Sequence, residues 1–395
     1  MKKILVFTTT FPSFLEGYVV PSFVYDLSKR LQKLGLQVVV LTPRLIGSKK
    51  YEEVEGIKIY RYPYFFVSKW EKLTDGAILP NIKKNRLLLF QVPFLILAGF
   101  INLIKIVKKE KINIIHSHWI IPQGFLSVIY KNFFNKDIKI LCTSHGSDIN
   151  GLSGKIGTFI KKYTLRYLDK LTVVSNDLKN KSISLGIDSG KVEVIPMGVD
   201  SDLFLPDKYD DNIKKQHNIK GKFLLFVGRL SEDKGIKYLI KSMVGIINKL
   251  PNSKLLIIGH GPLENKLKKQ VIDLNLEENI IFIGSVDNKD LPRYFSTSDL
   301  FIGPSLSEGF GLVFVEAILS GTVVIGTKEG GIVDIIEEGK TGFFVDKVDS
   351  IKLQDKILEV IENNNFDRIR SREIIDSKFS WDIVSKKYYK LINNI

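Results

Sequence analysis

The sequence has almost no cysteine and carries no segment typical of export. Cys142 is the only cysteine in 395 residues, which excludes an intrachain disulfide and a cysteine-rich zinc site. The apolar run Ile4–Phe7 is too short for a secretory signal and passes directly into three threonines, so we expect it to form a buried first strand. These two absences favour a reducing, cytoplasmic location.

Signatures of dinucleotide cofactors and of metal ions are also missing. The loop after the expected first strand contains no Gly-x-Gly-x-x-Gly, and the Gly-x-Gly at 259–261 lacks the third glycine, which weakens a nicotinamide-binding interpretation. Asp200 and Asp202 form an Asp-x-Asp pair, but they fall in a polar linker where we expect no metal. We predict that the protein uses no metal and no resident cofactor.

Positive charge is in excess, and all of the excess lies in the first half of the chain. The formal net charge is +15. Residues 1–200 contain 30 Lys and Arg against 15 Asp and Glu, whereas residues 201–395 contain 28 of each kind. A basic surface predicts an anionic partner such as phosphate groups or an anionic membrane, although solvated surface lysines explain the count as well. Aromatic and basic residues are not interleaved in a binding motif, so we predict no nucleic-acid partner.

One long apolar stretch, residues 87–107, approaches the length of a membrane span. Basic residues flank it on both sides, and Gln91, Pro93, Asn102 and Lys105 interrupt it. The segment that follows it has the pattern of a core strand. We therefore expect a core or surface-lying helix here instead of a transmembrane one, and contact with lipid stays open.

Short runs rich in valine and isoleucine alternate with helical patterns along the whole chain, which predicts parallel sheets buried on both faces. The pattern restarts after a polar stretch near residues 200–221. This predicts an α/β fold with two Rossmann-like, doubly wound parallel-sheet domains facing a central cleft. We expect an N-terminal domain over 1–200, a C-terminal domain over 201–378, and a helix within 379–395 that could pack back on the N-terminal domain.

Ligands of such sheets bind at the carboxyl ends of the strands, so the loops there are the candidate sites. In the second half, Glu308 and Glu316 lie at an expected strand-to-helix junction. Glycines let a backbone approach a ligand closely, and the start of a helix offers free N–H groups to an anion. Glu316 can accept hydrogen bonds from a diol such as ribose, unless it is simply a solvated helix residue. The turn between the two carboxylates consists of Gly309, Phe310, Gly311 and Leu312.

Arg229 and Lys234 lie in the loop that follows the first strand of the second half. Arginine offers a planar fork to phosphate oxygens, and lysine offers a compact charge. Together with a helix start they could neutralise a departing diphosphate without a metal, whereas either one alone would suit an ordinary surface.

Polar residues also follow two neighbouring strands in the first half. His118 ends one strand, and His145 and Asp148 follow the next. A neutral histidine beside a reacting sugar can donate or accept a hydrogen bond. We expect alternation along the strand to turn His116 away from His118, which would leave His116 a structural role.

Taken together, these motifs resemble the GT-B-fold retaining glycosyltransferases of family 4, the large set called glycosyl transferases group 1. The resemblance covers essentially the whole chain. The matching motifs are a Gly17 loop after the first strand, HSHW ending at Trp119, HGSD at 145–148, GRLSEDKG at 228–235, and SEGFGLVFVEA at 307–317.

The resemblance implies roles that can be carried over residue by residue. In the second half, Glu308 would contact hydroxyls of the transferred sugar, and Glu316 would contact the ribose of the donor. Arg229 and Lys234 would hold the diphosphate, helped by the backbone of Gly309–Leu312.

In the first half, the resemblance places His145 against the transferred sugar. Gly17 would bring its loop close to the donor phosphates, and His118 and Asp148 would contribute to acceptor binding. His145, Glu308, Arg229 and Lys234 are then the expected catalytic residues.

The reaction implied is transfer of a hexosyl group from a nucleotide-diphosphate sugar to a hydroxyl, with retention of the anomeric configuration. The acceptor would be a saccharide or a lipid-linked molecule of cell-surface polysaccharide or glycolipid synthesis, and the enzyme would be cytoplasmic or peripheral on the inner face of the cell membrane. Two alternatives stay open. One is a GT-B nucleotide-sugar epimerase, and the other is a non-catalytic two-domain sugar-binding protein.

Overall fold

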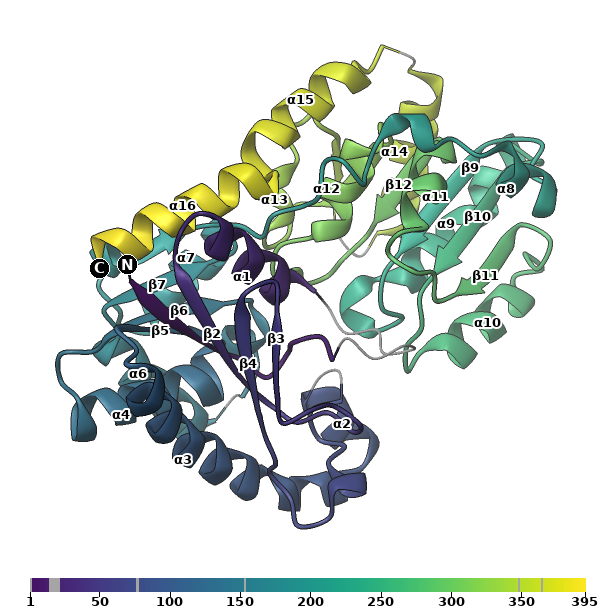
Figure 1. Cartoon of the computed structure of the whole chain (residues 1–395). Coiled ribbons are helices and arrows are strands. Elements are labelled where there is room, and N and C mark those ends of the chain that lie inside the picture. The colour runs from purple at the N-terminus through teal and green to yellow at the C-terminus, as the bar shows by residue number, and fades with distance from the viewer. Residues whose placement is uncertain (1, 14–21, 76–77, 153, 347–348, 364) are drawn as a thin grey trace. The chain divides into compact units, whose positions relative to one another are not determined.

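The computed structural model describes residues 2–13, 22–75, 78–152, 154–346, 349–363 and 365–395 (Figure 1). The chain divides into two compact units. Unit 1 comprises Met1–Gly198 together with Val384–Ile395, and unit 2 comprises Val199–Ile383.

Unit 1 is built on a sheet with strand order β3-β4-β2-β1-β5-β6-β7-β8. Its strand pairs are parallel apart from β3 and β4, which form an antiparallel hairpin that the expectation of a wholly parallel sheet missed. The order reverses between β1 and β5, so the loops after these strands lie at the switch point where such sheets bind ligands. The strands are β1 (Lys3–Phe7), β2 (Gln37–Pro43), β3 (Tyr51–Val54), β4 (Ile57–Tyr62), β5 (Ile114–His118), β6 (Lys139–Ser144), β7 (Lys170–Val173) and β8 (Val192–Val194).

Helices cover both faces of this sheet, with α3 and α4 on one face and α1 on the other (Figure 1). On the first face, alternate apolar residues of β1 and β2 pack against α3 in one core cluster. The helix comes close to the sheet because it carries Gly99, where a Cβ would meet the hydroxyl of Tyr62 at 3.1 Å. The helices are α1 (Phe23–Lys33), α2 (Ile78–Lys84), α3 (Val92–Glu110), α4 (Phe125–Phe134), α5 (Ser147–Asn150), α6 (Lys155–Tyr167) and α7 (Asn176–Ser184), with short turns η1 (Ser68–Trp70), η2 (Arg86–Gln91), η3 (Ile120–Gly124) and η4 (Ser189–Lys191).

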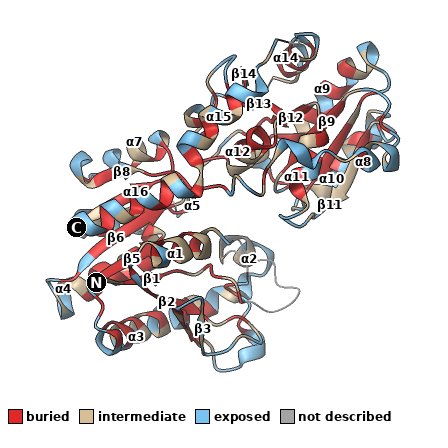
Figure 2. Cartoon of the chain, turned by 45° about the horizontal axis from the view of Figure 1, so that its top comes forward, coloured by how far each residue is buried: buried red, intermediate tan, exposed pale blue. Residues whose placement is uncertain are grey.

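Unit 2 is built on a wholly parallel sheet with strand order β11-β10-β9-β12-β13-β14. Its order reverses between β9 and β12, which are directly paired. The central strands β10, β9, β12 and β13 are almost entirely buried, as Figure 2 shows by their red colour, whereas the edge strands β11 and β14 are mostly half-buried. They are β9 (Phe223–Val227), β10 (Lys254–Ile258), β11 (Ile280–Gly284), β12 (Leu300–Gly303), β13 (Val323–Thr327) and β14 (Phe343–Val345).

The helices of unit 2 also form two layers. The layer of α9, α10 and α14 packs on one core cluster of the sheet, and α11, α12 and α15 pack on its other side. The elements are η5 (Pro206–Lys208), α8 (Asp211–Gln216), η6 (Glu232–Lys234), α9 (Ile236–Lys249), α10 (Glu264–Asp273), α11 (Leu291–Thr297), α12 (Leu312–Leu319), α13 (Ile332–Ile335), α14 (Ser350–Glu362) and α15 (Arg368–Phe379). Two doubly wound α/β units are therefore present, which confirms the predicted fold class.

The last helix, α16 (Trp381–Asn394), begins in unit 2 and belongs to unit 1 from Val384 onward. Within unit 1, the side chain of Tyr388 is fully buried, and Lys2 donates from Nζ to the carbonyl of Ile392 at 3.0 Å. The last helix of the chain thus helps to close the core of unit 1 around β6 and β7.

The long apolar stretch forms η2 and α3. Together they span Arg86–Glu110 and are long and apolar enough, by length and composition, to cross a membrane. Only 22% of the most apolar window is buried in the structure, so much of this segment faces outward. The inner side of α3 nevertheless packs on the sheet through Leu95, Leu103 and Ile106. A helix at the surface of unit 1 agrees with the sequence expectation.

Candidate active site

Two loops at the switch point of unit 2 bring most of the expected donor-binding residues together. The first follows β9 and carries Arg229 and Lys234, and the second follows β12 and carries Glu308. The backbone carbonyl of Asp233 in the first loop accepts hydrogen bonds from the amides of Leu306 at 2.7 Å and Ser307 at 3.3 Å in the second. The two loops therefore form a single structure at the carboxyl end of the sheet.

Lys234 and Glu308 form an ion pair across these loops. Lys234 Nζ lies 2.5 Å from Glu308 Oε2, and the Ser305 hydroxyl lies 3.5 Å from the same oxygen. The lysine side chain is 20% exposed and the glutamate side chain 13% exposed, so the pair is partly withdrawn from water without being sealed. A lysine ammonium has three donors, and this contact uses one of them.

Two glycines make this arrangement possible. Gly235 follows Lys234 with φ +64°, and a Cβ there would collide with the carbonyl oxygen of Pro304 in the second loop. Gly330, with φ +54°, lies against the backbone of Glu308, and the next amide donates to the Glu308 carbonyl at 3.1 Å. A side chain at position 235 would push the loop after β9 away from the loop after β12, and a side chain at position 330 would push the loop after β13 away from Glu308.

Arg229 lies in the same loop but is differently placed. Its guanidinium is 54% exposed and pairs with Asp233, with Nη2 3.6 Å from Oδ1. Its Nε donates to the Ser231 hydroxyl at 3.2 Å. The arginine is thus held by its own loop, and its exposed guanidinium has donors left for a ligand.

Glu316 lies one turn into α12. Its side chain is partly buried, and burial raises the pKa of its carboxyl group to about 7. Among the residues that the structure describes, no side chain or backbone donor forms a hydrogen bond with this carboxylate. A partly buried carboxylate without a protein partner is suited to accept hydrogen bonds from a bound ligand.

The helix start next to these carboxylates is uncapped. Gly311, with φ +101°, precedes α12, and no side chain caps the first amides of the helix. Phe310 is buried, and its ring packs on Phe379 at a centroid distance of 5.5 Å. Gly309 and Leu312 are partly exposed. The backbone amides of this turn can therefore bind an anion while the Phe310 side chain anchors the turn to α15.

In unit 1, the ends of β5 and β6 bring two histidines into contact. His118 Nδ1 lies 3.0 Å from His145 Nε2, so one ring donates a hydrogen bond to the other. The His145 ring also packs against Phe23 and Trp119, each at a centroid distance of 4.9 Å. Burial lowers the pKa of His145 to about 3 and that of His118 well below its ordinary value, so both rings are neutral near pH 7.

The expectation that His116 turns away from His118 was wrong. Residues two apart on a strand share one face, and the two rings lie 4.5 Å apart. His116 is fully buried, and its Nε2 lies 2.8 Å from the hydroxyl of Thr143. The same hydroxyl lies 3.4 Å from that of Tyr388 on α16. His116 therefore belongs to a buried polar network, as a structural role requires.

Asp148 is buried and fully used by the chain itself. One carboxylate oxygen accepts from the amide of Ile120 at 2.7 Å, and the other accepts from the Ser144 hydroxyl at 2.7 Å and the Gly146 amide at 3.2 Å. These bonds tie the segment after β5 to the segment after β6. Asp148 therefore positions the loops that carry the two histidines, which is a different task from the direct acceptor contact expected from the sequence.

No group of three or more His, Cys, Asp or Glu is arranged to hold a metal ion within the described part of the chain. Gly17, expected to approach the donor, lies outside the described residues.

Comparison with known proteins places this chain among characterised families. The family model "Glycosyltransferase Family 4" matches residues 20–203, and "Glycosyl transferases group 1" matches residues 209–376. The uncharacterized glycosyltransferase MJ1178 of Methanocaldococcus jannaschii is 31% identical over 77% of this chain and 80% of its own length. The chain belongs to the family 4 glycosyltransferases. It is therefore a transferase enzyme, as predicted.

Other relatives of this family 4 glycosyltransferase have named activities. The N-acetyl-alpha-D-glucosaminyl L-malate synthase of Bacillus anthracis is 27% identical over 80% of this chain and 84% of its own length. A GDP-mannose-dependent alpha-(1-6)-phosphatidylinositol monomannoside mannosyltransferase of Mycobacterium tuberculosis is 25% identical over 63% of this chain and 68% of its own length.

Solved structures share the fold of the glycosyltransferase. Sucrose-phosphate synthase from Thermosynechococcus elongatus gives a TM-score of 0.81 at 20% identity, covering 100% of this chain and 99% of the other. Anabaena HepE in complex with UDP-glucose gives a TM-score of 0.77 at 17% identity and covers 100% of both chains. These likenesses confirm the GT-B fold expected from the sequence.

Sequence reasoning about the glycosyltransferase missed several residues of these sites. Asp233 joins the two loops of unit 2, Ser305 contacts the carboxylate of Glu308, and Phe23 packs against His145. Asp233 lies inside the quoted motif SEDK, so its spacing to Arg229 was available as a signal. Tyr388 had no local signal, because its contact with Thr143 joins residues 245 positions apart.

Proposed function

We propose that this family 4 glycosyltransferase transfers a hexosyl group from a nucleotide-diphosphate sugar to a hydroxyl, with retention of the anomeric configuration. The observation that carries the proposal is the meeting of Lys234 with Glu308, beside the uncapped start of α12 and the unpartnered carboxyl group of Glu316. Cationic, amide and carboxyl groups are thus gathered at one switch point, as a donor with a diphosphate between two sugar rings requires.

We assign each group of unit 2 to one part of the donor. Lys234, Arg229 and the amides after Gly311 would bind the diphosphate. Glu316 would accept hydrogen bonds from the ribose diol, and Glu308 would accept them from hydroxyls of the transferred sugar while it holds Lys234 in place. The UDP-glucose bound by Anabaena HepE and the GDP-mannose named for the mycobacterial relative support a nucleotide-sugar donor.

The proposed chemistry depends on stabilising the departing diphosphate. As the bond from the anomeric carbon to the phosphate oxygen breaks, negative charge grows on that phosphate, and we assign Lys234 and Arg229 to balance it. The attacking hydroxyl of the acceptor gives its proton to the departing phosphate. We propose that this occurs without a metal or a resident cofactor, and turnover that persists in a chelator such as EDTA is the expected outcome.

In unit 1, we propose that neutral His145 makes a hydrogen bond to the transferred sugar. The pKa of His145 near 3 means that the ring stays neutral at physiological pH, so it acts as a hydrogen-bonding group and not as a cation. His118 would hold its orientation through the bond between the rings.

We propose a saccharide or lipid-linked acceptor, in a pathway of cell-surface polysaccharide or glycolipid synthesis on the cytoplasmic side of the membrane. The excess of basic residues in 1–200 and the phosphatidylinositol-linked acceptor named for the mycobacterial relative support this choice. The L-malate named for the Bacillus anthracis relative is a small soluble acceptor, so membership of the family does not by itself identify the class of acceptor.

The test begins with thermal unfolding in the presence of UDP, GDP or ADP. One nucleotide should raise the melting temperature more than the others, and the same rise should be lost in Glu316→Ala. The sugar donors of that base are then incubated with the enzyme, and the products are analysed by mass and by the anomeric NMR signal. A product with inverted configuration, or an isomerised donor with no transfer, would contradict the proposal.

A further inference from the structure

Unit 1 exposes large apolar side chains in the segment 66–70, which includes η1, in η2 and in the first half of α3. Phe66 is 83% exposed, Phe90 73% and Leu87 71%. Soluble proteins rarely leave such a concentration of large apolar groups in water unless a partner covers it. We call these side chains the apolar face; they are Phe66, Trp70, Leu87, Leu89, Phe90, Phe94, Leu97 and Ile101.

Contacts between aromatic rings join the segments of this face. The ring of Phe94 on α3 lies 5.1 Å from that of Phe66 and 5.5 Å from that of Phe65, centroid to centroid. The Phe65 ring in turn lies 6.4 Å from that of Trp70. The segment that carries Phe66 and Trp70 is therefore joined to α3, and η2 leads directly into the same helix.

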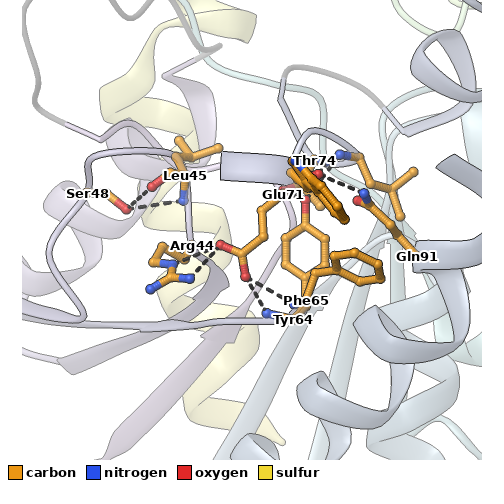
Figure 3. A network of polar contacts seen from close by, with 10 residues as sticks. Arg44, Leu45, Ser48, Tyr64, Phe65, Glu71, Thr74 and Gln91 are labelled. Carbon is orange, nitrogen blue, oxygen red and sulfur yellow. Dashed lines mark hydrogen bonds and ion pairs between the residues drawn. The ribbon is translucent and has the colours of Figure 1, made fainter. Parts of the chain in front are cut away.

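A polar network fixes the loop that carries Phe66 and Trp70, as Figure 3 shows. Glu71 accepts hydrogen bonds from the amides of Tyr64 at 2.8 Å and Phe65 at 3.1 Å, and it pairs with Arg44 at 2.8 Å. Gln91 donates to the carbonyl of Trp70 at 2.7 Å. A loop held in this way presents its aromatic rings in a defined arrangement and loses little conformational entropy when it binds.

The outward stripe of α3 changes character along the helix. Phe94, Leu97 and Ile101 are exposed at helical spacing, and the same stripe continues with exposed Lys105 and Lys108. The apolar end adjoins η1 and η2, whereas the basic end lies toward the carboxyl end of the helix. An apolar centre with a basic border is typical of a surface that lies in the interface of a membrane.

The border of the apolar face is strongly basic. In the described part of residues 63–111, the exposed acidic side chain is Asp75, because Glu71 and Glu110 are buried and paired with cations. The exposed basic side chains of the same segment are Lys69, Lys72, Lys83, Lys84, Arg86, Lys105, Lys108, Lys109 and Lys111. This charge is complementary to anionic phospholipid headgroups, whose surface potential attracts clustered lysines and arginines.

We propose that the apolar face docks unit 1 onto an anionic phospholipid membrane. Phe66, Trp70 and Phe90 enter the boundary between headgroups and acyl chains, and Lys84 and Arg86 contact the headgroup phosphates. The proposal deepens the proposed function, since it names the surface that would bring the enzyme to a lipid-linked acceptor.

The other occupants of such a surface fit less well. A transmembrane span would surround α3 with lipid, but Leu95, Leu103 and Ile106 on its inner side pack in the core of unit 1. A second copy of the chain would place two equally basic borders against each other, which like-charge repulsion opposes. A bilayer rich in anionic lipid satisfies both the apolar centre and the basic border.

The experiment measures binding of the full chain, without donor or acceptor, to vesicles of phosphatidylcholine alone or mixed with phosphatidylglycerol. Binding to the mixed vesicles and little binding to the neutral ones is expected, together with loss of binding in high salt. Trp70 reports insertion, because it is 60% exposed, whereas Trp381 is buried and Trp119 is half-buried. Its fluorescence should shift to shorter wavelength on the mixed vesicles, and the shift should vanish in Trp70→Phe.

Matched variants identify the surface. Phe90→Ser with Leu97→Ser should weaken vesicle binding roughly tenfold or more, since two exposed apolar groups no longer enter the membrane. Lys84→Gln with Arg86→Gln should weaken it by a similar factor, roughly tenfold or more. The controls are Ile351→Ser with Ile369→Ser, which remove side chains that are 67% and 75% exposed in unit 2, and Lys215→Gln with Lys220→Gln. Both controls should bind as the unchanged chain does.

Several results would overturn the proposal. They are equal binding to neutral and mixed vesicles, no shift in Trp70 emission, or equal losses in the matched controls. Self-association in sedimentation that Phe90→Ser with Leu97→Ser abolishes would identify a second copy as the partner. Release from membranes only by detergent would identify a span. The vesicle experiment contains no sugar donor. A negative result would therefore overturn membrane docking without contradicting the proposed transfer reaction, which is tested separately.

Discussion

At the scale of single residues, Lys234 is the group whose role can be tested most directly. Its ammonium lies 2.5 Å from Glu308 and has donors left for a phosphate. Lys234→Ala should lower kcat by about 10²–10³-fold, as removal of a donor that acts on developing charge does in other enzymes. Steady-state kinetics with the nucleotide sugar found in the unfolding screen measure the effect.

The matched control for that prediction is Lys237→Ala, three positions further along the chain. Lys237 is 41% exposed and pairs with Glu232, outside the Lys234–Glu308 contact. It should keep a normal kcat. A normal rate for Lys234→Ala as well would remove Lys234 from the catalytic residues.

Glu316 predicts a pH dependence of stability. Its pKa is raised from 4.5 to about 7 in the folded chain, so the folded state holds the proton between these values. The stabilisation from this proton is complete below pH 4.5 and is lost as the pH rises through about 7. Glu316→Gln should therefore unfold less readily than the unchanged chain at pH about 8, by on the order of 2–3 kcal/mol, and equally readily at pH about 4.

Urea unfolding at the two pH values measures this difference. Glu278→Gln, which changes an exposed carboxylate of unit 2, should show no such pH-dependent gain. If Glu316→Gln is as stable as the unchanged chain at both pH values, then Glu316 is solvated and its pKa is ordinary.

The contact between His118 and His145 predicts that His118 holds the His145 ring in position for catalysis. His118→Ala removes the ring nitrogen that lies 3.0 Å from His145, so kcat should fall about tenfold while KM for the donor changes little. His118→Asn keeps a polar group near the same place and should recover part of the rate. The NMR signals of the ring nitrogens add a structural measurement, because the chain has only 5 histidines. An unchanged His145 signal in His118→Ala would contradict the positioning role.

At the scale of elements, strong local patterns predicted most of the fold. Runs such as Ile4–Phe7 became buried strands, and helices such as α9 (Ile236–Lys249) lie between them, as the alternation of apolar runs with helical patterns predicted. The helices α14 and α15 were missed, although Asp349 and Asp367 cap them through backbone hydrogen bonds. The capping signal was readable, but it lies in polar segments where periodicity is weak.

The candidate site was predictable where its geometry is local. Arg229 and Lys234 share one loop, and the pairing of β9 with β12 places that loop beside Glu308, as the strand-end rule implies. The hydrogen-bond partners of the side chains in the site were not predictable. Asp148 lies in the same HGSD motif as His145, yet its carboxylate accepts hydrogen bonds from Ile120, Ser144 and Gly146. The spacing of residues in the sequence does not predict the bond to Ile120.

The packing of α16 in unit 1 predicts that substitutions of its buried residue Tyr388 lower the stability of the fold. Tyr388 is fully buried, and its hydroxyl lies 3.4 Å from those of Thr143 and Thr172 on neighbouring strands. Tyr388→Ala should lower the free energy of unfolding by about 3–5 kcal/mol, as truncation of a large core side chain does. Tyr388→Phe, which removes only the hydroxyl, should lower it by about 1 kcal/mol. Tyr389→Ala, at a partly exposed neighbour, is the control, and an equal loss there would show that the whole helix and not the buried ring matters.

At the scale of the whole molecule, the residues assigned to the donor's nucleotide all belong to unit 2, and the histidines belong to unit 1. Hydrogen exchange measured by mass spectrometry distinguishes ligand binding at the residues of unit 2 from ligand binding at the histidines of unit 1. The nucleoside diphosphate alone should protect the amides of residues 228–235 and 304–319, because it would bind the loops after β9 and β12 and the start of α12. A nucleotide present at about 100 times its Kd stabilises the folded state by about 2.7 kcal/mol. The complete nucleotide sugar should add protection at 145–148, because only it carries the group assigned to His145. Protection of 145–148 by the nucleotide alone, with none at 304–319, would contradict this division of roles between the two units.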